Sequence, residues 1–139
     1  MERCSAMEDA RLDTPAAIDT HLTKTLKAWE RERYGVRFVF CDAKNRVRAH
    51  CPVDDLPAIA RPDERRQAVS IFASALADDE VDGALLVVLT RPGSGAVCDS
   101  DRVWFHASHK ACAQIGVRLL GVYLVTPADL REILLDDAL

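Results

Sequence analysis

The chain has 139 residues, of which 49% are hydrophobic, which is enough apolar material for one domain with a single core. Its 18 basic and 22 acidic residues give a formal net charge of -4, which disfavours a broad nucleic-acid surface. No apolar run approaches the roughly 20 residues that span a bilayer, and residues 1–13 lack the pattern of a signal peptide. We therefore expect a cytoplasmic protein without a membrane partner, with a flexible tail over residues 1–13 and one domain over residues 14–139.

The cysteine pattern also limits the class of protein. The chain has an odd number of cysteines and no CxxC pair, so neither a disulfide framework nor a structural zinc knuckle is indicated. Cys41, Cys51 and Cys112 fall at apolar positions of the expected elements, where a free cysteine behaves as a small buried hydrophobe. We expect reduced thiols.

The first half of the expected domain is a helix followed by a hairpin. Thr14-Pro15 combines a cap with a proline at the first helical position, and four apolar residues then recur at helical spacing. That buried face consists of Ile18, Leu22, Leu26 and Trp29. Residues 36–41 and 46–51 are rich in strand formers, and the turn-forming residues 42–45 join them into an antiparallel hairpin.

Strict alternation in the second strand predicts which side chains face inward. The inward set is Val47, Ala49 and Cys51, and the outward set is Arg46, Arg48 and His50. His50 and His21 occupy polar positions in their patterns, so neither receives a functional interpretation. A short third strand is expected near residues 53–56.

A second helix is expected from Pro62 to about Leu76. It should end before the acidic residues 78–80, because their charge has the wrong sign for the end of a helix. Its buried stripe is predicted to be Ala68, Val69, Phe72, Ala75 and Leu76.

The stretch 83–125 reads as one strand, loop, helix and strand unit. Ala84 to Leu89 is a short uninterrupted apolar run, typical of a strand covered on both faces. The breaker cluster RPGSG follows, Asp99 or Ser100 can cap a helix, and Gly116 can end it before a strand over 117–125. A final helix is expected after Thr126-Pro127, with Leu130, Ile133 and Leu134 on its inner face. The order of elements predicts a three-layer α/β/α sandwich around a mixed sheet.

Three segments carry a resemblance to a known family. They are FVFCDAKNRV, RPDERRQAVSIFASAL and SDRVWFHASHKACAQIGVRLLGVYLV. From residue 34 to residue 125 the chain resembles the JAB/MPN (JAMM) metalloprotease-like domain in its bacterial RadC-type form. This resemblance implies a fold of the MPN/cytidine-deaminase-like class.

The resemblance also implies a degenerate metal site. In that family, His-x-His-Pro-Ser-Gly followed by Ser-x-x-Asp binds zinc, and the metal lowers the pKa of a bound water. Aligning Pro92 with the motif's proline places Leu89 and Arg91 at the two histidines. Counting back from Gly116 places Asp101 on the aspartate and Cys98 on the serine, with the loop one residue shorter than in the family. With one metal ligand of three retained, the resemblance implies a domain that holds no metal.

The family's general base is a glutamate upstream of the hairpin. Glu32 lies near the expected position, although strict counting from Asp42 lands on Tyr34. Glu32 is therefore a weak candidate for a catalytic residue.

Arg91 and Asp101 have two open interpretations. Asp101 in the first turn of a helix suits the helix dipole, and Arg91 can simply pair with it. Alternatively, Arg91, Ser94 and the helix start form a pocket for an anion or a peptide carboxylate in place of the metal.

Two enzyme alternatives involve the following helix. His106, His109 and Cys112 are spaced by three and could form a relocated metal site with Cys98 nearby, or be two solvated histidines and a core cysteine. Cys98 at a helix start could instead be a nucleophile, with His106 or His109 as its base.

The function expected from these patterns is a non-catalytic protein-binding or scaffold module that uses the former active-site groove, residues 89–101. We expect a protein or peptide partner, a homodimer and no cofactor. The first alternative is a hydrolase or peptidase that uses Cys98, or zinc bound by His106, His109 and Cys112. The second is a DNA-associated accessory protein, in which Arg46 and Arg48 would contact DNA.

Overall fold

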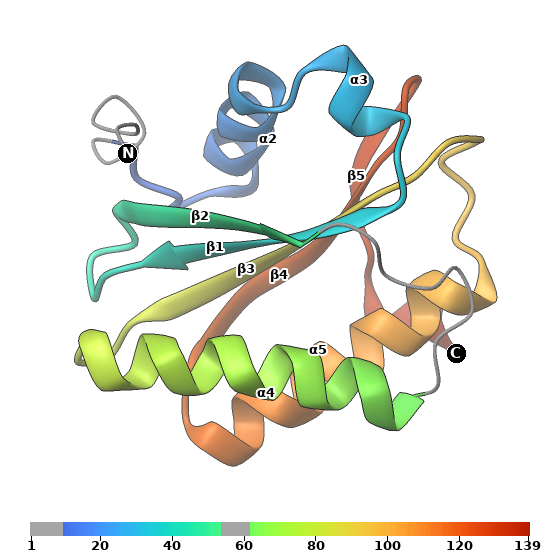
Figure 1. Cartoon of the computed structure of the whole chain (residues 1–139). Coiled ribbons are helices and arrows are strands. Elements are labelled where there is room, and N and C mark those ends of the chain that lie inside the picture. The colour runs from blue at the N-terminus through green and yellow to red at the C-terminus, as the bar shows by residue number, and fades with distance from the viewer. Residues whose placement is uncertain (1–9, 54–61) are drawn as a thin grey trace.

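A five-stranded mixed sheet forms the centre of the domain (Figure 1). The computed structural model describes residues 10–53 and 62–139. The strand order is β2-β1-β3-β4-β5, and within the described residues β3 and β4 pair in parallel while the other neighbours are antiparallel. The helices are α2 (Pro15–Thr25), α3 (Ala28–Arg31), α4 (Pro62–Asp79), α5 (Asp99–Ile115) and the 3-10 helix η1 (Leu135–Ala138). The strands are β1 (Gly35–Cys41), β2 (Val47–Val53), β3 (Ala84–Thr90), β4 (Arg118–Val125) and β5 (Leu130–Glu132).

The predicted unit of strand, loop, helix and strand is confirmed as β3, α5 and β4. Residues 84–89 of β3 are buried, which explains its uninterrupted apolar sequence. Gly116 ends α5 in the left-handed conformation, with φ of 87°, and its N–H donates to the Cys112 carbonyl. The chain then returns in β4 beside β3, and the loop between β3 and α5 lies at the carboxyl end of the parallel pair.

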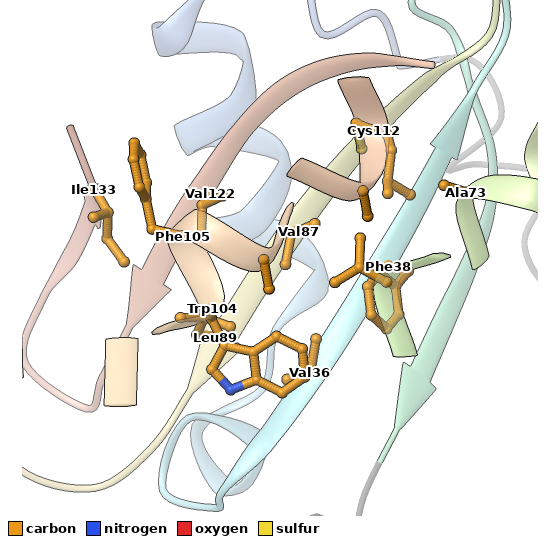
Figure 2. Close-up of a cluster of buried hydrophobic side chains, with 14 of the residues drawn as sticks. Val36, Phe38, Ala73, Val87, Leu89, Trp104, Phe105, Cys112, Val122 and Ile133 are labelled. Carbon is orange, nitrogen blue, oxygen red and sulfur yellow. The ribbon is translucent and has the colours of Figure 1, made fainter. Parts of the chain in front are cut away.

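Helices lie on both faces of the sheet. The larger core packs α4 and α5 against one face, and Figure 2 shows its side chains, with Trp104 beside Leu89 and Val36. On the other face Ile18 and Leu22 of α2 and its C-cap residue Leu26 pack in a second core. The coarse prediction of a mixed α/β domain is therefore correct.

A β-bulge changes which side chains of β2 face which core. Phe40 pairs with Ala49 but Cys41 pairs with Val47, so one residue of β2 is extra at this point. Val47 consequently packs in the α2 core, while Cys51 packs against the α4/α5 core. The prediction of one inward set on β2 is wrong, because a single extra residue reverses the alternation. The antiparallel hairpin itself is confirmed.

Two details of the predicted helices are wrong. Trp29 is not on the buried face of the first helix, because α2 ends at Thr25 and Trp29 lies in α3 with 56% of its surface exposed. Helix α4 does not stop before residues 78–80 but continues through Asp79, and Ala73 rather than Ala75 is buried. Packing of α4 on α5 and β3 outweighs the unfavourable dipole effect, which is worth only about 0.3–1 kcal/mol.

The predicted final helix is replaced by a turn and a strand. Thr126 is buried and closes a turn, because its N–H donates to the Asp129 carbonyl and its Oγ1 accepts from the Asp129 N–H. The chain reverses and β5 pairs with the open edge of β4. Ile133 is buried as expected, but Leu134 is 55% exposed. Pairing along β4 satisfies backbone groups that a helix would leave at an open sheet edge.

The packed domain begins before the expected boundary at residue 14. Arg11 forms a β-bridge with Arg46, and Leu12 is buried in the α2 core. Residues 1–9, and residues 54–61 with most of the expected third strand, lie outside the described residues. Within the described part of the chain, no helix is long and apolar enough to cross a membrane.

Candidate functional site

A small hollow lies where β3 ends and α5 begins. Leu89 and Arg91 are two residues apart at the end of β3, so they project to the same side, toward the start of α5. The hollow has a volume of about 30 Å³, which is room for a single water molecule. Its lining consists of Tyr34, Gly35, Val36, Arg65, Leu89, Thr90, Arg91, Ser100, Asp101 and Trp104. Three of the four degenerate motif positions, Leu89, Arg91 and Asp101, therefore share one hollow, whereas Cys98 does not line it. Tyr34, at the counted glutamate position, lines the same hollow.

Arg91 and Asp101 form a largely buried ion pair. The Nε of Arg91 donates to Oδ1 of Asp101 at 3.3 Å, and Nη2 donates to Oδ2 at 2.8 Å. The side chains are only 12% and 3% exposed. The hydrogen bonds to Asp101 raise the pKa of Arg91 above its ordinary value. The structural interpretation, in which Arg91 pairs with the first-turn carboxylate, is confirmed.

The remaining donors of Arg91 hold the loop that follows β3. Nη1 donates to the carbonyls of Pro92 and Ser94 at 3.1 and 3.0 Å, and Nη2 donates to the Ala96 carbonyl at 2.7 Å. A guanidinium has five N–H groups, and all five are engaged in these bonds and the two to Asp101. None of the N–H groups of Arg91 is therefore free to bind an anion in the pocket that was expected from Arg91, Ser94 and the helix start.

Asp101 also closes the start of α5. Its Oδ2 accepts the backbone N–H of Cys98, the N-cap residue, at 3.0 Å. A carboxylate at the third helical position that accepts from the N-cap amide satisfies a backbone donor that the helix leaves free. Asp101 thus joins the helix start to the end of β3 through Arg91.

Arg65 is a site residue that the sequence analysis missed. It lies on α4, is 3% exposed, and its Nη1 donates to both the carbonyl and the Oγ of Ser100 at 2.7 Å. Its guanidinium also lies 5.0 Å from the centre of the Trp104 ring. Burial lowers the pKa of Arg65. The sequence did hold one indication that Arg65 is buried. It precedes Val69 by one helical turn and so lies on the buried stripe of α4.

The two candidates for the family's glutamate position lie in different places. Tyr34 lines the hollow, whereas Glu32 is the exposed C-cap of α3 and does not line it. Strict counting therefore gives the position nearer the hollow, and a tyrosine there supplies no carboxylate.

Cys98 is not placed beside a base. It is exposed at the N-cap of α5, where a thiol is accessible. His106 follows it by eight residues, which is about 12 Å along a helix. The Nε2 of His106 lies 3.0 Å from the carbonyl oxygen of Ala138, so this nitrogen contacts Ala138. This arrangement lacks the contact between nucleophile and base on which the thiol-hydrolase alternative depends.

His106, His109 and Cys112 do not converge on one point. Cys112 is buried among core side chains, as Figure 2 shows, and burial raises the pKa of its thiol to about 11. His106 and His109 are exposed, and the centre of the His109 ring lies 4.4 Å from that of the Phe105 ring, with the two rings tilted by 46°. Within the described residues, no three His, Cys, Asp or Glu side chains are grouped to hold a metal ion.

A second hollow of about 110 Å³ adjoins the first and shares Gly35, Val36 and Thr90 with it. Its other lining residues are Leu26, Trp29, Glu30, Arg33, Arg37 and Pro52. Trp29 and Tyr34 are both more than half exposed, and the guanidinium of Arg33 lies 5.5 Å from the centre of the Trp29 ring. Exposed Trp, Tyr and Arg are the residues that dominate protein interfaces.

The structure also brings together two histidines that the sequence analysis set aside. The Nε2 atoms of His21 on α2 and His50 on β2 are 2.8 Å apart, and Nη1 of Arg37 lies 3.2 Å from Nδ1 of His50. Glu30 on α3 forms an ion pair with Arg37. Burial lowers the pKa of His21 and lowers that of His50 to about 3. The bulge in β2 turns His50 toward α2, so strict alternation could not reveal this pair.

No family model matches this chain, and no curated protein matches it. The resemblance to the JAB/MPN domain is therefore a proposal, argued from the residues and their positions.

Proposed function

We propose that this chain is a three-layer α/β/α domain of the MPN/cytidine-deaminase-like class, of the RadC-type JAB/MPN form, which binds a protein or peptide and performs no catalysis. The observation that carries the proposal is the bidentate Arg91–Asp101 ion pair at the aligned metal position. The guanidinium occupies that position with a permanent positive charge on the chain itself. Zinc has no place in the proposed activity.

The positions of the aligned residues support the alignment to the JAB/MPN family. Tyr34, Leu89, Arg91 and Asp101 come from the start of β1, the end of β3 and the first turn of α5, yet they line one hollow. A zinc site of the family's type requires this convergence, because all ligands must reach one metal ion. Here the convergence remains while the ligand chemistry has changed.

The neighbouring surface supports binding rather than catalysis. Trp29 and Tyr34 present large rigid rings to solvent beside the two hollows. The second hollow has mostly apolar walls, with Arg33 at its rim above Trp29. Such a surface suits an extended peptide that places an apolar side chain in the hollow and a carboxylate near Arg33. A second copy of the chain is one form that this partner can take.

Rebuilding the metal site tests the alignment to the family. Leu89→His with Arg91→His should bind zinc close to one equivalent per chain together with Asp101, measured by elemental analysis of protein purified without an affinity tag. The wild-type chain should hold none. Adding Asp101→Ala to the rebuilt protein should abolish the zinc. A rebuilt protein that folds and takes up no zinc would show that the alignment to the family is incorrect.

Site-specific photo-cross-linking tests the binding surface. A photoreactive amino acid at Trp29 or Tyr34 should cross-link a partner in cells, whereas the same group at Ile71 or Val81 should not. Ile71 and Val81 are matched controls, because they are exposed hydrophobic residues away from both hollows. A band of twice the chain mass would identify a second copy as the partner. Equal cross-linking from all four positions would contradict a binding surface at Trp29 and Tyr34.

A further inference from the structure

A continuous chain of side-chain contacts joins α2 and α3 to the edge of the sheet. Glu30 on α3 pairs with Arg37 on β1, Arg37 contacts His50 on β2, and His50 contacts His21 on α2. His21 is only 5% exposed, and the two imidazole rings are tilted by 50° with their centres 5.0 Å apart. Four polar side chains from four elements are thus joined by successive contacts.

The identity of the donor at one end fixes every proton in this chain of contacts. Arginine can only donate, so Nδ1 of His50 must accept from Arg37 and its Nε2 must carry the proton. That Nε2–H then donates to Nε2 of His21, whose own proton lies on Nδ1. Both imidazoles are neutral in this arrangement, and each lone pair is already used as an acceptor. An added proton therefore has no position that leaves both hydrogen bonds intact.

The charges around the pair also oppose a proton. Arg37 lies on the β1 side, and Lys24 lies one turn from His21 on α2 and acts on it electrostatically. Glu30 of α3 supplies a negative charge, but its carboxylate is bound to Arg37. A protonated His50 would face the Arg37 guanidinium across a distance that now holds a hydrogen bond. The lowered pKa values of His21 and His50 agree with this geometry.

We propose that Arg37, His50 and His21 form an acid-sensitive latch, which holds α2 and α3 on the sheet edge when both histidines are neutral and opens when either is protonated. Opening separates the like charges and exposes the imidazoles to water. The apolar contacts of Ile18, Leu22 and Leu26 keep α2 docked at neutral pH, so acid raises the population of an open state that these contacts oppose.

The latch adjoins the proposed binding surface. Glu30 and Arg37 line the second hollow, and Trp29 precedes Glu30 in α3. Opening would therefore move one wall of that hollow, which makes the surface pH-dependent. This consequence rests on the proposed function, whereas the latch itself does not.

Hydrogen exchange of the α2 amides tests the latch without any partner. Rates for residues 18–26 are compared with rates for residues 107–111 of α5 between pH 7.5 and pH 5.0, after correction for intrinsic chemical exchange. With an ordinary histidine pKa of about 6.5 in the open state, the open population should rise about 30-fold for one histidine and toward about 1,000-fold for both. The α5 amides should be protected more strongly than the α2 amides at every pH, because they exchange only when the whole domain unfolds.

The four histidines of the chain provide matched variants. His21→Gln with His50→Gln should remove the pH response of α2, because glutamine does not titrate. His106→Gln with His109→Gln removes two exposed histidines of α5 and should leave that response unchanged. A response of α2 that persists at full size in the first variant would overturn the latch, and so would equal protection of the α2 and α5 amides in the wild-type chain.

A measurement on the wild-type chain decides the case if the His21→Gln, His50→Gln variant does not fold. The ¹⁵N chemical shifts of the imidazoles report tautomer and charge, and at pH 7 they should show His50 protonated on Nε2 and His21 on Nδ1, both neutral. A charged His50, or one protonated on Nδ1, would overturn the latch. Because neither experiment involves a partner, a failure of the latch is distinct from a failure of the binding function.

Discussion

Arg91 at the end of β3 and Asp101 in the first turn of α5 are joined by two hydrogen bonds, and Asp101 accepts a third from the Cys98 amide. The pair therefore fixes the end of a buried strand to the start of a helix. The other three N–H groups of Arg91 bind carbonyls of the intervening loop. This one guanidinium organises the region in which a parallel α/β pair would ordinarily hold its chemistry.

Removal of the arginine should destabilise the domain strongly. Arg91→Ala leaves the Asp101 carboxylate buried without its charge partner, and breaking a buried pair in this way costs about 3–5 kcal/mol. Urea denaturation should show that loss in the free energy of unfolding. Arg66→Ala is the matched control, because Arg66 pairs with Asp63, whose side chain is 88% exposed, and it should change stability by less than about 1 kcal/mol. Similar losses in the two variants would contradict a structural role for Arg91.

Stability should fall as the pH falls from about 6.5 toward 4.5. The folded-state pKa of His50 is lowered to about 3 and that of His21 is also lowered, so in this window the unfolded chain binds protons that the folded chain does not. Each histidine contributes a slope of up to about 1.4 kcal/mol per pH unit, with stability greater at the higher pH. Chemical denaturation at several pH values measures the slope. His50→Gln should reduce it, and an unchanged slope would contradict a neutral buried His50.

The lower limit of that window lies above the titration of Asp42. The pKa of Asp42 is lowered from its ordinary value by hydrogen bonds from the Arg46 and Lys44 amides and the Arg46 side chain, which outweigh its desolvation. The stability that the Asp42 carboxylate contributes is therefore present above about pH 4. It is lost only as the pH falls through the folded-state pKa of Asp42. A loss of stability already seen between pH 6.5 and pH 4.5 is consequently not caused by Asp42.

Substitution of Gly116 should weaken the end of α5 through backbone conformation alone. Its φ is 87°, and a Cβ added there would meet no atom within 4 Å. Gly116→Ala should therefore lower the free energy of unfolding by about 1–2 kcal/mol, the cost of placing an L-residue in the left-handed region. Gln114→Ala, at an exposed position two residues earlier, should change it by less than about 0.5 kcal/mol. A neutral Gly116→Ala would mean that the helix ends differently.

Thiol labelling should separate Cys98 from the core cysteines. In a Cys4→Ser background, one thiol should react rapidly with a disulfide reagent under native conditions, and Cys98→Ser should remove it. Cys98 is exposed, whereas Cys41 and Cys112 are buried and burial raises their thiol pKa to about 12 and about 11. Cys51 is half-buried, and burial raises its thiol pKa as well. Rapid labelling of Cys112 would contradict its place in the core.

The sequence by itself determined the central unit of this protein. An apolar run, a breaker cluster and a glycine stop are local signals, and they correctly predicted β3, α5 and β4. The predicted cap was wrong, because the N-cap of α5 is Cys98 and not Asp99 or Ser100. The pairing of Arg91 with Asp101 was also predicted as one alternative, because a strand end and the following helix start are close in any such unit. Local signals suffice where the structure is set by neighbours in the chain.

The tertiary structure alone decided three other features. Residues 126–134 form a turn and β5 rather than the predicted helix, because the open edge of β4 offers hydrogen-bond partners for their backbone. The donors of Arg91 proved fully occupied only when the loop carbonyls had positions. The meeting of His21 and His50 required a bulge at Cys41 that reverses the faces of β2. Each feature joins groups far apart in the chain or inserts one residue into a register, and residue periodicity carries no information about either.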